Sequence, residues 1–131
     1  MSGTAAVPVP GVKASARVLF SEKITGSPAL ALSVLEFAPG SQVPAHTHPG
    51  SEEFLYVASG GGTLTVGKEG MPFSREDSLF LPSGQEHGAK FMAFEPTTAI
   101  QIYAPAGPEQ RFFTAAAPST PGAQPPMPKV K

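Results

Sequence analysis

The stretch that decides the fold is Gly40–Gly60, with the sequence GSQVPAHTHPGSEEFLYVASG. It places His46 and His48 between prolines and then enters Glu53–Ala58, a short segment rich in aromatic and branched apolar residues. In an extended chain the side chains of residues i and i+2 point to the same side, so both imidazoles can reach one point. The stretch therefore predicts a β-strand that follows two potential metal ligands.

Similar segments continue along the chain, and each is bounded by turn residues. They are Leu30–Phe37, Thr63–Val66, Ser78–Leu81, Lys90–Phe94 and Thr97–Ala104. Strands of about four to eight residues at this spacing are typical of a β-sandwich or barrel, and no segment keeps a helical period. Gly60-Gly61-Gly62 is predicted to be a hairpin turn. The fold class is therefore expected to be all-β.

The 131 residues are enough for one domain, and both ends differ from the centre in composition. We expect the β-barrel to occupy 15–114. Residues 1–14 are small and contain glycine and proline, and are predicted to be a flexible segment. Residues 115–131 are rich in proline and have no apolar period, which predicts a disordered tail.

Composition excludes several classes of function. The chain has 9 basic and 10 acidic residues, a net charge of −1 and no basic run, which disfavours nucleic-acid binding. It has no cysteine, so disulfides, cysteine nucleophiles and thiolate metal sites are excluded. No apolar run approaches the roughly 18 residues of a membrane span. The start lacks the features of a secretory signal, so we expect a cytoplasmic protein, although removal of a signal would leave the same start.

The three histidines form the main candidate site. His87 lies after a Pro-x-Gly turn that can bring it toward His46 and His48, and Glu52 and Glu53 follow the pair. Imidazole and carboxylate ligands together suit a divalent transition metal such as Fe, Mn, Ni, Co or Zn. A His-x-His pair is a weak signal alone, and the glutamates are also compatible with plain surface charge. Every histidine of the chain belongs to the pattern, however, which favours a metal site.

The spacing of these residues resembles the cupin family. The two motifs that carry the resemblance are Gly40-x5-His46-x-His48-x4-Glu53-x6-Gly60 and Pro82-x-Gly84-x2-His87. Two positions depart from the family pattern, since Glu76 stands where a glycine is expected and Phe91 where an asparagine is expected. Both family residues usually serve turns or packing, so the departures leave the expected ligands intact.

The resemblance implies a single jelly-roll β-barrel with a metal ion inside its mouth. The ligands that it implies are His46, His48, Glu53 and His87. A variant motif with a shorter gap would select Glu52 instead. Glu53 shares a strand face with Leu55 and Val57, a series typical of a barrel interior, so we expect Glu53 to be the ligand.

A divalent ion with three neutral imidazoles and one carboxylate keeps a net positive charge, which favours an anionic or chelating small-molecule substrate. Gln101 and Tyr103 share one face of the Thr97–Ala104 segment, and we expect these two residues to orient the substrate. The alternative is that this polar face meets solvent. Arg111 is either an anion-binding residue at the pocket or the partner of a nearby acid such as Glu109.

The leading functional hypothesis is a metal-dependent enzyme, with dioxygenase-like chemistry ahead of isomerase or lyase chemistry of sugar or uronate type. The alternative from another class is a non-catalytic cupin that binds a small molecule. We also expect a homodimer, because Phe54 and Tyr56 lie opposite the inward face of their strand. Further phenylalanines, such as Phe94 and Phe112, exceed what a small interior readily holds.

Overall fold

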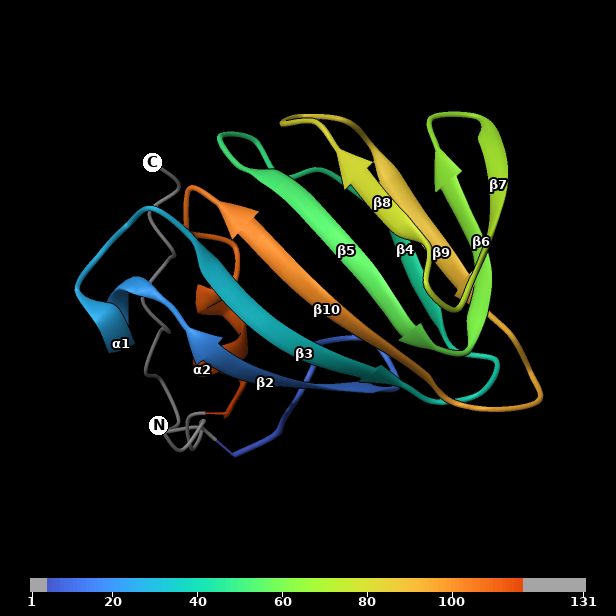
Figure 1. Ribbon diagram of the computed structural model, residues 1–131, viewed down its shortest axis with the longest axis horizontal. Coiled ribbons are helices and arrows are strands. Elements are labelled where there is room, and N and C mark those ends of the chain that lie inside the picture. Colours follow the sequence, from blue (N-terminus) through green and yellow to red (C-terminus); the bar gives the residue numbers. More distant parts are fainter. Residues whose placement is uncertain (1–4, 117–131) are drawn as a thin grey trace.

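The computed structural model describes residues 5–116, which form two antiparallel β-sheets and two short helices (Figure 1). The strands are β1 (Val7–Pro8), β2 (Ala14–Phe20), β3 (Ala31–Phe37), β4 (Gln42–His46), β5 (Glu52–Ser59), β6 (Gly61–Val66), β7 (Glu69–Ser74), β8 (Ser78–Leu81), β9 (His87–Phe91) and β10 (Thr97–Ala104). The helices are α1 (Glu22–Thr25) and α2 (Gln110–Ala116). The prediction of an all-β fold is confirmed.

The order of the strands brings distant parts of the chain together. One sheet has the order β1-β2-β3-β10-β5-β8, and the other has the order β4-β9-β6-β7. From β3 onward the chain crosses to the opposite sheet after every strand except β6, which forms a hairpin with β7. The β4–β5 and β8–β9 connections consequently meet at one end of the molecule (Figure 1). These two connections carry the two histidine motifs.

The glycine run between β5 and β6 differs from the prediction. Gly60, with a φ of 83°, separates two strands that lie in different sheets, so Gly60–Gly62 does not form a hairpin turn. A Cβ at Gly60 would come within 2.6 Å of the Thr97 Cα, so the crossover packs directly against the first residue of β10. The hairpin instead closes after β6, where Val66 pairs with Glu69.

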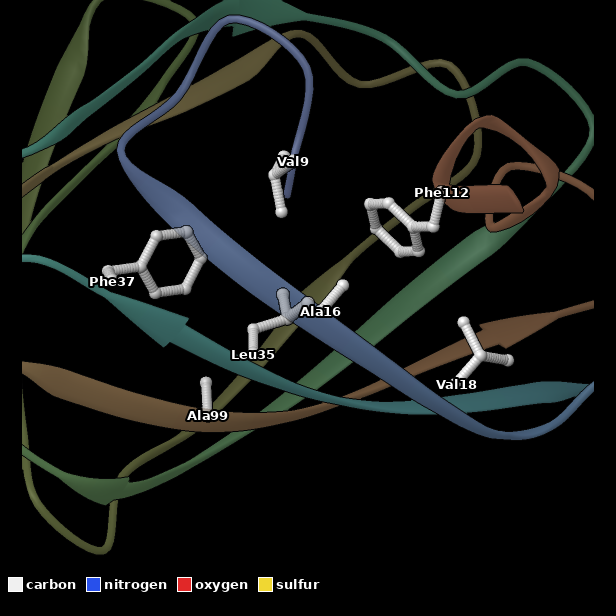
Figure 2. Packing of buried hydrophobic residues seen from close by; sticks show 7 residues of the cluster. All are labelled: Val9, Ala16, Val18, Leu35, Phe37, Ala99 and Phe112. Carbon is white, nitrogen blue, oxygen red and sulfur yellow. The ribbon is translucent and has the colours of Figure 1, made fainter. Parts of the chain in front are cut away.

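The two ends of the described chain complete the core. Val9 and Phe112 are buried in one hydrophobic cluster with Ala16, Val18, Leu35, Phe37 and Ala99. Figure 2 shows Val9 and Phe112 projecting over the strands that carry Leu35 and Ala99. A stacked contact between Phe37 and Phe91, with ring centroids 3.9 Å apart, joins the two sheets.

The fold therefore begins before the predicted boundary at residue 15, because β1 pairs with β2 and Val9 is buried. The predicted tail, 115–131, lies outside the described residues except for the last two positions of α2. Within 5–116, neither helix has the length or the hydropathy needed to cross a membrane.

Candidate metal centre

The three imidazoles converge at the end of the molecule where the connections meet. His46 ends β4 and pairs with His87 at the start of β9, while His48 lies in the loop that follows β4. The Nε2 atoms of His46 and His48 are 3.0 Å apart. One ligand nitrogen from each of the three residues lies within 4.8 Å of the others, so a single ion can reach all three.

Backbone carbonyls orient two of these rings. His46 Nδ1 lies 2.8 Å from the Pro44 carbonyl oxygen, and His87 Nδ1 lies 2.8 Å from that of Gln85. A carbonyl can only accept, so each Nδ1 carries the proton of the neutral ring and each Nε2 is left with a lone pair. Contacts of this kind fix the tautomer and the orientation of metal-binding histidines.

Glu53 supplies a carboxylate to the same point. Its side chain is 4 % exposed, and its Oε1 lies 3.1 Å from His87 Nε2 and 3.4 Å from His48 Nε2. Glu52 is exposed on the opposite face of β5, whereas Val57 shares the buried face with Glu53. The predicted alternation of the strand is therefore confirmed, and the structure places Glu53, not Glu52, at the imidazoles.

These residues fit a bound cation. Glu53 Oε1 and His87 Nε2 are both buried, and neither has a hydrogen-bond partner with good geometry among the described residues. An acceptor oxygen that faces a nitrogen lone pair at 3.1 Å is repulsive unless a proton or a cation lies between them. Nitrogen and carboxylate donors of this kind are those that divalent transition metals prefer. The donor set is therefore suited to a divalent transition metal.

The pKa values of the three histidines also suit a bound cation. Burial, which disfavours the charged ring, lowers the pKa of His46 and lowers that of His48 to about 4. These two rings are therefore neutral at pH 7, as metal binding requires. Burial also acts against a charged His87, but the carboxylate of Glu53 and the carbonyl of Gln85 together outweigh it and raise the His87 pKa. The cluster thus attracts positive charge at the Glu53–His87 pair.

Gln101 and Tyr103 lie behind the cluster on β10, on the face that points into the molecule. Their exposed fractions are 3 % and 1 %, so the polar face of β10 does not meet solvent. Gln101 Nε2 donates to Glu53 Oε2 at 2.6 Å and to the Tyr103 hydroxyl at 3.0 Å. That hydroxyl lies 3.5 Å from His48 Nε2. Gln101 therefore connects the carboxylate to the phenol.

The Tyr103 hydroxyl remains protonated at neutral pH, because burial raises its pKa well above the ordinary value. Its oxygen accepts from Gln101 and, at 3.4 Å, from Arg111 Nη2. Tyr103 holds its neighbours through these contacts. Together with His48, it is absent from the described residues that line the adjoining cavity.

A cavity of about 290 Å³ lies between the two sheets and reaches the cluster. Most of its wall is aliphatic or aromatic, with contributions from both sheets such as Leu35, Phe37, Leu55, Leu64, Phe73 and Phe91. Its polar wall includes His46, Glu53, His87, Gln101 and Arg111. The volume is near the lower end of the roughly 300–1,000 Å³ usual for small-molecule sites.

Two parts of this site differ from what the sequence predicts. Val9 and Val12, in the segment predicted to be flexible, line the cavity. Helix α2 was not predicted, and it brings Arg111 to the cavity, as the first of the two roles considered for this residue requires. A signal for the first existed in the valines at positions 7, 9 and 12, which recur within an otherwise small and proline-rich segment. The seven-residue α2 has too few turns to show a helical period.

Comparison with known proteins agrees with this architecture. The family model for the Cupin domain matches residues 33–103. The tetracenomycin polyketide synthase protein TcmJ of Streptomyces glaucescens is 30 % identical over 94 residues, which are 72 % of this chain and 63 % of TcmJ. The chain spans less than two thirds of the length of the curated relatives that it matches.

Two solved structures show the same fold. The polyketide cyclase RemF of Streptomyces resistomycificus has a TM-score of 0.68 and 22 % identity, and the match covers 76 % of this chain and 72 % of RemF. A predicted oxalate decarboxylase of Thermotoga maritima has a TM-score of 0.67 and 21 % identity, with coverage of 79 % and 91 %. The expected jelly-roll architecture is therefore confirmed.

Proposed function

Because the chain belongs to the cupin family, we propose that it is a metal-dependent enzyme that acts on a small, largely apolar organic molecule with chelating oxygen atoms. One observation carries the proposal. Three imidazole nitrogens and the buried Oε1 of Glu53, which has no well-aligned hydrogen-bond donor among the described residues, converge on one point at the wall of an apolar cavity. An open cavity beside a metal cluster is typical of catalytic sites, since structural sites are closed by protein ligands.

His46, His48, Glu53 and His87 are the residues that would hold the ion, with Fe, Mn, Ni, Co and Zn as candidate metals. A divalent ion bound by these residues would supply Lewis acidity toward a carbonyl or enol oxygen of the substrate. Gln101 keeps the carboxylate of Glu53 in place through the 2.6 Å hydrogen bond. The contacts of Tyr103 with Gln101 and His48 give it a positioning role.

Gln101 also faces the substrate. Its Nε2 must point at the carboxylate, because only the amide nitrogen can donate. Its Oε1 is consequently the free acceptor, and this buried atom has no partner among the described residues. Gln101 lines the cavity, so we assign this oxygen to a hydroxyl or enol proton of the substrate. Such a contact would orient the substrate against the metal.

For the reaction, we place enolisation and ring closure of a polyketide-type compound first. The relatives and neighbours include a polyketide synthase protein and a polyketide cyclase, which supports this class. Compounds of this type carry several carbonyl groups on a carbon skeleton. The apolar walls suit the skeleton, and the cluster suits a pair of neighbouring carbonyl oxygens.

Oxygenation, which the sequence alone placed first, is the second candidate. The observation in its favour is the donor set itself, since imidazoles with a carboxylate are ligands that redox-active Fe(II) and Mn(II) accept in oxygenases. Isomerase or lyase chemistry of sugar or uronate type fits less well. A polyhydroxylated substrate would meet a wall that is mainly aliphatic and aromatic.

The test uses benzoylacetone, a small β-diketone, with protein loaded in turn with Zn²⁺, Mn²⁺ or, anaerobically, Fe²⁺. Interconversion of the keto and enol forms is followed by absorbance, and oxygen by electrode. We expect metal-dependent acceleration of the interconversion without oxygen uptake, and its loss in His48→Ala. Oxygen uptake would select the second candidate. If benzoylacetone binds but neither its keto–enol interconversion nor oxygen uptake is accelerated with any of the three metals, the protein is a binding module and not an enzyme.

A further inference from the structure

Helix α2 adds a cation to the cavity from outside the family-matched region. The match ends at residue 103, and Arg111 lies beyond it, on the first turn of α2. The next residue, Phe112, is fully buried in the core cluster, which anchors the helix against the barrel (Figure 2). Arg111 is therefore held at the cavity by a packed neighbour.

The guanidinium lies close to the candidate metal centre. Arg111 Nη2 donates to the Tyr103 hydroxyl at 3.4 Å, and the guanidinium carbon is 4.9 Å from the centre of the Phe112 ring. The Tyr103 hydroxyl in turn lies 3.5 Å from His48 Nε2, so a single side chain separates the guanidinium from the cluster. Among the described residues that line the cavity, Arg111 is the one permanent cation.

We propose that Arg111 binds an anionic group of the substrate, so that the substrate is an organic acid or an enolate with an apolar body. This deepens the proposed function, because it concerns the same cavity and rests on its being a substrate site. The guanidinium presents several donors in a planar fork that matches a carboxylate. Aliphatic walls strengthen such a pair, since water is excluded from it.

The competing role for Arg111 is purely structural. Glu109, two residues earlier, is a fully buried carboxylate, and it accepts from the Gly107 amide at 2.6 Å and from Gln110 Nε2 at 2.9 Å. Compensation of buried negative charge at Glu109 or Glu53 would hold Arg111 in place with no substrate. The two roles differ in what they predict for ligands that carry or lack a charge.

The experiment compares 1-naphthoate with the neutral 1-naphthylmethanol, which has the same rings. Binding of each is measured by calorimetry to the full chain, once loaded with Mn²⁺ and once stripped by EDTA. We expect Arg111→Gln to weaken naphthoate binding about tenfold or more and to leave alcohol binding within about twofold. The matched control is Arg75→Gln, which removes the same charge from an exposed turn and should change neither affinity.

Equal affinities of Arg111→Gln and the native chain for naphthoate, or an equal loss for both ligands, would overturn the proposal. The melting temperature of each variant is recorded, and Arg111→Lys provides a second variant that keeps the charge. It should retain part of the preference for naphthoate. The EDTA-stripped protein distinguishes the role of Arg111 from the proposed enzyme activity. The preference for naphthoate over the alcohol should persist without metal, whereas turnover of benzoylacetone requires the metal.

Discussion

At the scale of single residues, Glu52 and Glu53 show how one position along a strand decides a function. They are chemically identical neighbours, but alternation sends Glu53 to the imidazoles and leaves Glu52 exposed. The sequence favoured Glu53 because Leu55 and Val57 mark the inner face, and the structure places Glu53 on that face. The same reasoning left open whether the polar face of β10 looked inward, since alternation alone does not say which face of a strand is buried.

We predict that Glu53→Gln weakens metal binding more than about tenfold, whereas Glu52→Gln leaves it within about twofold. The amide keeps the shape of the side chain but removes the charge that attracts the ion, and even the loss of a residue that only supports a ligand costs about 10–100-fold. Metal content after dialysis and competition with a fluorescent chelator measure the effect. An equal loss of metal affinity in the two variants would show that Glu53 is not a metal ligand.

Glu76 is a residue at which the sequence departs from the family pattern, and the structure shows what the departure costs. It has a φ of 73° and is the one non-glycine residue with positive φ in 5–116. The left-handed region costs a side chain about 1–2 kcal/mol. Its ion pair with Arg75, at 3.9 Å between well-exposed side chains, contributes little to stability. A glycine fits this position better.

We therefore predict that Glu76→Gly raises the free energy of unfolding by about 0.5–1 kcal/mol, after allowance for the greater freedom of glycine in the unfolded chain. Urea denaturation measures it. Glu36→Gly is the matched control, since Glu36 is exposed within the extended β3. That variant should lose about 0.5–1 kcal/mol. A loss in both variants would mean that the Glu76 side chain makes a contribution larger than its strain.

At the scale of elements, proline and small residues explain where the sequence was a poor guide. β8 and β10 have their predicted bounds, because proline or glycine ends each apolar segment. β4 and β7 were not predicted, since each contains a proline. Both strands lie at the edges of their sheet, where the missing amide is tolerated. Such a position in a sheet cannot be recognised from a single strand.

β9 begins three residues earlier than the predicted Lys90–Phe94 segment and ends at Phe91, because its first part is His87, Gly88 and Ala89. These residues carry little strand preference of their own. The structure shows why glycine is needed, since a Cβ at Gly88 would lie 2.8 Å from the carbonyl oxygen of Val43 on β4. The close approach of β4 and β9 is what pairs His46 with His87. The candidate site therefore depends on a residue with a weak local signal.

The crossover between β5 and β6 gives a prediction at this scale. Gly60→Ala should cost about 3 kcal/mol, because the new Cβ meets Thr97 and the Pro96 carbonyl oxygen in addition to the strain of positive φ. Thr97 has little freedom to move, since its Oγ1 accepts from the Gly61 amide at 3.0 Å.

The control is Gly26→Ala at the end of α1, where φ is 79° and a Cβ would meet open space. Only the backbone strain applies there, so the expected loss is about 1 kcal/mol. Both values come from urea denaturation of the otherwise native chain. Similar losses in the two variants would show that the contact between the crossover and β10 relaxes readily.

At the scale of the whole molecule, the two faces of the larger sheet have different tasks. The inner faces of β5 and β10 carry Glu53, Gln101 and Tyr103. Their outer faces carry Phe54, Tyr56 and the half-buried isoleucines of β10. The site therefore uses the inward-pointing side chains of two neighbouring strands. The same alternation leaves apolar side chains on the outside of the sheet.

This outer surface is continuous across three strands. Phe54 on β5 pairs with Phe80 on β8 and with Ile102 on β10, and the rings of Phe54 and Phe80 are 5.0 Å apart. Phe80 is 51 % exposed. Charged residues of the same sheet face lie around this surface: Glu52 at the start of β5, and Arg17 and Glu36 on β2 and β3, beyond β10. An apolar centre with charges of both signs at its rim is the usual anatomy of a protein interface.

We propose that a second copy of the chain covers this surface, related by a two-fold axis that sets the Phe54–Phe80 patch against itself. Light scattering at several concentrations should then give about 27 kDa, twice the 13.5 kDa of one chain.

Phe80→Lys should convert the dimer to a monomer, because each copy would bury a charge against its partner. Phe94→Lys is the control, since Phe94 is 94 % exposed in the loop before β10 and lies outside the patch. A mass of 13.5 kDa at every concentration would refute the dimer, and loss of the dimer in Phe94→Lys alone would move the interface to the β9–β10 loop.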